Sequence, residues 1–166
     1  SICFSEEDVR PMGRIAGGVR AITLEGDDEV VAMELAEKDE ELLVVTQAGY
    51  GKRTPVEDYK TQKRGGKGLL TYDKAKFNKT GQLIGAMTVS ETDEVMLINS
   101  DGIIIRIKAS DVSRLGRATQ GVRIMKVAED ANIIAMAKVV NDDTAGITEA
   151  EKTKNASGEE QTTLGV

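Results

Sequence analysis

The sequence predicts an all-β fold built from propeller-like units of four-stranded antiparallel sheet. Two observations carry this prediction: similar stretches recur at offsets of 50 and then 53 residues, and apolar runs of strand length alternate with glycine turns. Helical periodicity is weak, and only 54–59 and 109–115 favour a single turn. Units of this kind cannot bury their faces alone, so neighbouring units are expected to pack together.

The repeat is clearest in two sets of aligned residues, Arg14, Arg64 and Arg117, and Gly18, Gly68 and Gly121. LLVVTQAGYGKR (42–53) also aligns with VMLINSDGIIIR (95–106), and each predicts a β-hairpin. The last unit has strand-like stretches near 95–99, 103–108, 121–127 and 132–139. We therefore expect about two complete blades plus a partial one: a partial blade at 1–34, a blade with a glycine-rich basic loop at 35–90, and a last blade at 91–140. Because the first unit begins beyond its hairpin turn, the chain is expected to be a fragment.

Charge is segregated along a chain of net charge −6. Segment 52–79 has nine cations against three acids, a net charge of +6, whereas 141–166 has six acids and two lysines, a net charge of −4. The low bulk of 141–166 predicts a disordered acidic tail. The combination favours polyanion binding with the tail as an internal competitor, whose deletion would tighten binding; the alternative is a tail that only aids solubility.

Composition argues against catalysis by this chain alone. It has no histidine and one cysteine, which removes the commonest general base and any zinc cluster, and we find no nucleophile–base pair. Aromatic residues make up 3% of the chain, so base stacking is not expected to be the main chemistry. No secretory signal opens the sequence and no apolar run reaches about 18 residues, which favours a cytoplasmic protein without a membrane partner.

The most unusual motif is Gln62-Lys63-Arg64-Gly65-Gly66-Lys67-Gly68. Glycines let backbone N–H groups approach an anion, and lysine and arginine add charge, so the motif predicts phosphate contacts without sequence readout. The alternative is a glycine-rich connector between strands, because the aligned loops 13–18 and 116–121 keep the arginine and the last glycine. A Walker A loop is excluded, since Gly68 follows Gly66-Lys67.

Arginines recur at equivalent positions of the units, at 14, 64 and 117 and at 53 and 106. On stacked units such residues would form an evenly spaced track along which a duplex could bend, at a cost of about 1–6 kcal/mol for a site of about 20–30 base pairs. The alternative is ion pairing within each unit to the equally recurrent Asp8, Asp58 and Asp111.

Three long stretches resemble the C-terminal domain of the bacterial DNA gyrase A protein, which is part of a type IIA topoisomerase: VRPMGRIAGGVRAITL (9–24), GYGKRTPVEDYKTQKRGGKG (49–68) and GRATQGVRIMKVAEDANIIAMAKV (116–139). The resemblance covers about residues 1–140. It implies a six-bladed β-pinwheel whose basic perimeter wraps DNA. Residues 62–68 match the seven-residue box of that family, Gln-Arg-Arg-Gly-Gly-Lys-Gly, at six positions, with Lys63 in place of an arginine. Because one further unit follows, this loop is either the principal wrapping box or a late-blade copy of it.

The resemblance also implies a function. It predicts double-stranded DNA binding and wrapping in support of ATP-dependent negative supercoiling by an A2B2 gyrase holoenzyme. The expected partners are DNA, the rest of gyrase A, and gyrase B. No catalytic residue and no cofactor are expected in this fragment, because ATP and magnesium belong to other parts of the holoenzyme. Topoisomerase IV and a protein-interaction propeller are the alternatives. The candidate DNA-binding residues are Arg14, Lys52, Arg53, Lys60, Gln62, Lys63, Arg64, Gly65, Gly66, Lys67, Gly68, Arg106 and Arg117.

Overall fold

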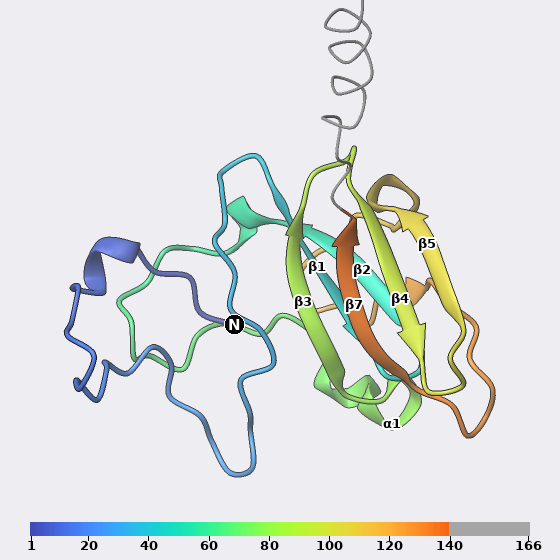
Figure 1. Ribbon diagram of the computed structural model, residues 1–166, viewed down its shortest axis with the longest axis horizontal. Helices are drawn as coiled ribbons and strands as arrows, with labels where there is room; N and C mark the ends of the chain where they lie inside the picture. Colours follow the sequence, from blue (N-terminus) through green and yellow to red (C-terminus); the bar gives the residue numbers. More distant parts are fainter. Residues whose placement is uncertain (140–166) are drawn as a thin grey trace, which may run out of the picture.

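The computed structural model describes residues 1–139, which form two antiparallel sheets side by side (Figure 1). One sheet has the strand order β3-β1-β2-β6 and the other β5-β4-β7. The predicted all-β architecture is confirmed. The strands are β1 (Glu41–Thr46), β2 (Tyr50–Pro55), β3 (Leu83–Val89), β4 (Glu94–Asn99), β5 (Ile104–Lys108), β6 (Val122–Arg123) and β7 (Ile133–Val139).

Three strands of the first sheet, β3-β1-β2, recur in the second sheet as β7-β4-β5. In the hairpin β1–β2 Leu43 pairs with Arg53, and in the hairpin β4–β5 Met96 pairs with Arg106, at the offset of 53 found in the sequence. A third strand, β3 or β7, pairs with the first strand of each hairpin, and both of these ladders shift register near their ends. Gly49 and Gly102 hold the hairpin turns at φ of +78° and +79°, a left-handed conformation that favours glycine.

Within residues 1–139, helical structure is limited to single turns. The 3₁₀ turns Glu6–Asp8, Val56–Asp58 and Ala109–Asp111 occupy corresponding places in the three units. A further 3₁₀ turn, Lys74–Lys76, leads into the short helix α1 (Phe77–Thr80). Among the residues that the structure describes, no helix is long and apolar enough to cross a membrane.

One apolar core joins the two sheets. It consists of strand residues from both sheets together with residues from the loops of the last unit: Leu43, Val45, Val89, Val95, Leu97, Ala109, Val112, Met125 and Ile133. β3 and β7 lie next to each other (Figure 1), and Gly85 leaves room for the side chain of Met136. Each hairpin is therefore buried by the neighbouring unit, as the repeat predicts.

Two expectations about strands need correction. Residues 9–40 form no strand, although 30–33 align with β3, and the side chains of Val30, Val31 and Met33 are exposed. The equivalent strand pairs with β1 in the middle unit and with β4 in the last unit. The stretch 121–127 forms a strand only at Val122–Arg123, which pairs with β2 of the preceding unit rather than within its own. The predicted acidic tail at 141–166 lies outside the described residues.

Candidate nucleic-acid interface

The glycine-rich loops connect one unit to the unit before it. Residues 61–69 lie against residues 1–3, where the Gln62 N–H donates to the Cys3 carbonyl at 2.8 Å and the Leu69 N–H donates to the Ser1 carbonyl at 2.6 Å. Residues 114–122 lie against β2 in the same way, and the Leu115 N–H donates to the Arg53 carbonyl at 2.8 Å. The connector interpretation of these loops therefore explains part of the motif.

Docking also explains the last glycine of each loop. Gly68 and Gly121 have φ of +74° and +79°, and a Cβ at either position would strike the backbone of the preceding unit, at Ser1 and Gly51. Within the motif, the Gly65 N–H donates to the carbonyl of Ala21 at 2.5 Å. These glycines make backbone contacts between neighbouring units of the chain. The prediction of phosphate contacts by this loop therefore rests on its cations and not on these glycines.

The aligned arginines occupy the same turn in each unit. Arg14, Arg64 and Arg117 each begin a two-residue turn. Arg64 reaches back to the preceding unit, where Nε donates to the carbonyl of Asp8 at 3.0 Å and Nη1 donates to the carbonyl of Arg20 at 3.2 Å. The Arg117 guanidinium likewise lies 6.0 Å from the ring centre of Tyr59. The contacts of Arg64 and Arg117 therefore cross between units. Arg14 and Arg64 are both exposed, and Arg117 is partly buried.

Lys52 and Arg53 are corrections to the predicted interface. Both side chains are buried, with 0% and 5% of their surfaces exposed, because residues 110–117 of the last unit cover β2. Lys52 Nζ donates to the carbonyls of Gly116, at 2.7 Å, and Arg117. Arg53 pairs with the Glu41 carboxylate, and its Nε donates to the Val112 carbonyl at 2.8 Å. These two cations hold adjacent units together and are not surface charges.

Arg106 occupies the position of Arg53 in the last unit. Its Nε donates to the Glu94 carboxylate at 2.8 Å, and this pair corresponds to Arg53–Glu41 one repeat earlier. The guanidinium is about half-exposed, because no loop covers β5 among residues 1–139. The predicted pairing of arginines within a unit is thus seen at these strand positions, with glutamate as the partner in place of Asp8, Asp58 or Asp111.

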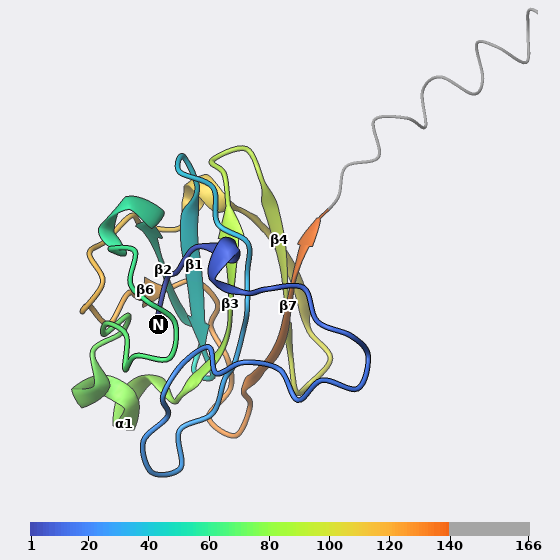
Figure 2. The ribbon, with the colours of Figure 1, turned by 90° about the vertical axis from the view of Figure 1, so that its left-hand side faces the viewer.

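The remaining cations of the basic segment form the basic surface, which we define as Lys60, Lys63, Arg64, Lys67, Lys74, Lys76 and Lys79. All seven are exposed. Segment 54–79, which carries them, also has three acids and therefore a net charge of +4. Figure 2 shows that the loop after β2 runs along one side of the molecule towards α1. Lys67 pairs with Glu25, but both side chains are largely exposed, and such a pair contributes little stability.

The sequence prediction missed four cations on or near the basic surface. Lys74, Lys76 and Lys79 belong to the basic segment but were not among the predicted contacts. Arg123 comes from the next unit, and its guanidinium lies 5.2 Å from the Tyr50 ring centre, on which the Lys79 ammonium also lies at 5.5 Å. The hydrogen bond from Arg123 lowers the pKa of the Tyr50 hydroxyl. Lys79 and Arg123 thus both make cation–π contacts with the Tyr50 ring.

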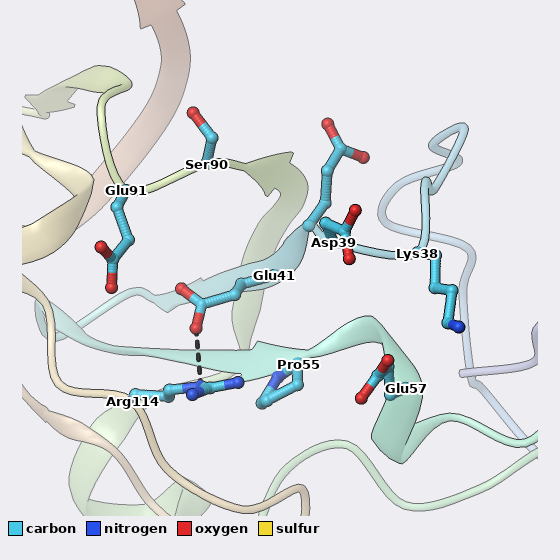
Figure 3. Close-up of a pocket in the computed structure, with 9 residues that line it drawn as sticks. Lys38, Asp39, Glu41, Pro55, Glu57, Ser90, Glu91 and Arg114 are labelled. Carbon is cyan, nitrogen blue, oxygen red and sulfur yellow. Dashed lines mark ion pairs between the residues drawn. The ribbon is translucent and has the colours of Figure 1, made fainter.

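A hollow of about 240 Å³ has the opposite electrostatic character (Figure 3). Its lining is dominated by carboxylates, those of Asp39, Glu40, Glu41, Glu57 and Glu91. The Arg114 guanidinium binds Glu41 there at 2.8 Å, so Glu41 is shared between Arg114 and Arg53. Within residues 1–139 no group of three or more acidic or cysteine side chains is placed to hold a metal ion. An anionic ligand is therefore expected on the basic surface and not in this hollow.

Burial of Lys52 predicts a measurable dependence of stability on pH. Desolvation lowers the pKa of Lys52 from 10.5 to about 8 in the folded state, and a neutral amine still donates to two carbonyls. Between these pH values the unfolded state binds the extra proton, so the free energy of unfolding rises as pH increases from about 8 towards 10.5. Relative to Lys52→Met, we expect wild type to gain about 1–2 kcal/mol over this range. Chemical denaturation checks this, and the exposed Lys126→Met is the control, with no such difference.

These features define a class of protein: an array of small β units, joined by docked loops and carrying an exposed cluster of cations. The chain belongs to the family described as the DNA gyrase C-terminal domain, beta-propeller, whose model matches residues 3–37, 40–90 and 93–139. The predicted resemblance is confirmed by this match.

Relatives and solved structures agree with the family. The DNA gyrase A protein of Staphylococcus aureus strain MRSA252 is 41% identical over 162 residues, which are 96% of this chain and 18% of that protein. A solved DNA gyrase A C-terminal domain superimposes with a TM-score of 0.77 at 29% identity, covering 82% of this chain and 46% of that one. A topoisomerase IV C-terminal domain superimposes with a TM-score of 0.79 at 24% identity, covering 92% and 47%, and shows the shared fold. The chain thus spans about a fifth of the length of its curated gyrase relatives.

Proposed function

We propose that this chain binds double-stranded DNA through phosphate contacts on the basic surface. The observation that carries the proposal is that the cations of the middle unit fall into two groups, one buried and one exposed. Lys52 and Arg53 are engaged in contacts between units, whereas the seven cations of the basic surface remain exposed on one continuous stretch of chain. The aligned loops of the other units have no cation at the positions of Lys63 and Lys67. Packing between units therefore does not require these two lysines.

Binding through this surface would tolerate any duplex sequence. Lysine ammonium groups on flexible side chains recognise phosphate charge and read no base edges. Arg64 is held by the carbonyls of Asp8 and Arg20, with its position fixed at the junction of two units. Of the thirteen predicted contacts the basic surface includes Lys60, Lys63, Arg64 and Lys67, and we add Lys74, Lys76 and Lys79. Arg14 and Arg106 are also exposed but lie outside this surface.

The larger role that we propose is DNA wrapping within a gyrase A protein. The support is the 41% identity to a protein of that name, of which this chain spans 18%. In this role DNA bends around the surface of the domain, within a cytoplasmic A2B2 assembly that includes gyrase B. Strand passage, with its ATP and magnesium, takes place elsewhere in that assembly and supplies the negative supercoiling.

Salt dependence of binding tests the proposal. If about four to six phosphates are neutralised, the slope of log K against log salt concentration is about −4 to −5. Fluorescence anisotropy with two duplexes of unrelated sequence and equal length is expected to give the same slope and similar affinities. A slope near zero, or a strong preference for one duplex, would contradict phosphate-directed binding. Binding of an acidic protein but not of DNA would instead favour a protein-interaction module.

A further inference from the structure

Tyr50 lies where the middle unit meets the last unit. It is the first residue of β2 and pairs with Arg123 of β6, so the two side chains lie on the same face of the sheet. Nη2 of Arg123 donates to the Tyr50 hydroxyl at 3.1 Å, and the guanidinium lies 5.2 Å from the ring centre. Tyr50 is 7% exposed, whereas Arg123 is exposed. A buried tyrosine therefore holds an exposed cation in a defined place.

A second cation reaches the same tyrosine from the middle unit. Lys79 Nζ lies 5.5 Å from the Tyr50 ring centre, and the lysine is exposed. The pKa of the Tyr50 hydroxyl is lowered, first by the hydrogen bond from Arg123 and further by the charges of Arg123 and Lys79. One hydroxyl group therefore interacts with cations from two neighbouring units.

The connection that carries Lys79 is longer in the middle unit than in the other two. Segment 68–83 has three more residues than the aligned segments, 18–30 and 121–133. Within it the chain forms α1, and the Thr80 carbonyl accepts a hydrogen bond at 2.9 Å from the turn of the first hairpin. This contact fixes the backbone beside Lys79 against the hairpin that carries the tyrosine.

Lys79 and Arg123 lack an acidic partner in the described part of the chain. The ion pairs found within residues 1–139 include neither of them. Two cations that interact with one group repel each other, and an anion bound beside them would offset this cost. We propose that Lys79 and Arg123 form a further phosphate contact for duplex DNA, with Tyr50 as its positioning residue. This inference rests on the proposed function and extends the contact with DNA from the middle unit to the last unit.

Tyr50 contributes by orienting Arg123 before DNA binds. An arginine side chain loses rotamer freedom when it contacts a phosphate, and the hydrogen bond to the Tyr50 hydroxyl already limits that freedom. A guanidinium has five N–H donors, so the bond to the hydroxyl leaves others for a phosphate. Removal of the hydroxyl is therefore expected to lower affinity without changing the salt slope, whereas removal of either cation lowers both.

Anisotropy titrations of duplex DNA at several salt concentrations test the contact. Arg123→Gln and Lys79→Gln are each expected to weaken binding by about three- to tenfold and to reduce the salt slope by about 1. Tyr50→Phe keeps the ring, and it is expected to weaken binding about threefold with the slope of wild type. The matched control is Lys126→Gln, which removes an exposed cation elsewhere in the last unit and is expected to bind like wild type.

A double-mutant cycle separates positioning from a general structural effect. Tyr50→Phe is expected to cause no further loss of affinity when Arg123 is already glutamine, and an equal loss in both backgrounds would overturn the positioning role. If Arg123→Gln shifts the unfolding midpoint, Lys79→Gln still tests the phosphate contact. Wild-type affinity and slope in both glutamine variants would overturn this inference while leaving the proposed function intact. A wild-type chain that does not bind DNA would overturn both.

Discussion

Gly49→Ala is expected to lower the free energy of unfolding by about 3–5 kcal/mol. Gly49 has φ of +78°, and a Cβ there would overlap the backbone oxygen of Met125. The Gly49 carbonyl accepts hydrogen bonds from the N–H groups of Ile124, at 2.8 Å, and Met125, at 3.2 Å. The substitution therefore adds backbone strain and also separates the last unit from the hairpin it covers. Urea denaturation followed by circular dichroism measures the effect.

Gly102→Ala is the matched control for this substitution. Gly102 occupies the same hairpin turn at φ of +79°, but nothing lies within 4 Å of a Cβ built there. Only backbone strain is expected, about 1–2 kcal/mol. Equal losses for the two variants would show that docking of residues 124–125 at the first hairpin contributes nothing to stability.

Replacing Lys60, Lys63 and Lys67 together by glutamine is expected to weaken duplex DNA binding by at least about tenfold and to reduce the salt slope by about 3. All three side chains are exposed, and Lys67 forms an exposed ion pair with Glu25. The fold should therefore persist, which the unfolding midpoint checks. Anisotropy titrations at several salt concentrations measure both quantities.

The control variant also removes three positive charges, but from lysines outside the basic surface. Lys38, Lys108 and Lys126 are exposed and lie outside the basic surface. Their joint replacement by glutamine is expected to change the salt slope by much less. If both triple variants lose affinity equally, binding follows net charge alone and the basic surface is not a site.

The hairpins were predictable from sequence because their signals are local. Alternating apolar residues and a turn glycine lie within about a dozen residues of each other. A strand near β6 was predicted, but its length of two residues and its partner were not, because β2 lies about 70 residues earlier in the sequence. Residues 30–33 carry a strand-like sequence, but a strand forms only where a neighbouring strand supplies its hydrogen bonds.

The candidate site was predictable in part for the same reason. A cluster of lysines beside glycines indicates an anion site. Such a site needs exposed lysines, and Lys60, Lys63 and Lys67 are exposed in the structure. The burial of Lys52 was not predictable, because it depends on carbonyl groups 64 and 65 residues further along the chain. Gly68 was assigned to phosphate approach, whereas its conformation serves docking on Ser1. The glycine that recurs in these loops, at positions 68 and 121, is therefore explained by packing between units.

Lysine acetylation with and without a saturating duplex, read residue by residue by mass spectrometry, tests the central claim most directly. The account predicts that DNA protects Lys60, Lys63, Lys67, Lys74, Lys76 and Lys79, while Lys108 and Lys126 react equally in both samples. Lys52 is expected to be unreactive throughout, because its side chain is buried. Protection of Lys108 and Lys126 with no protection of the basic surface would contradict the account.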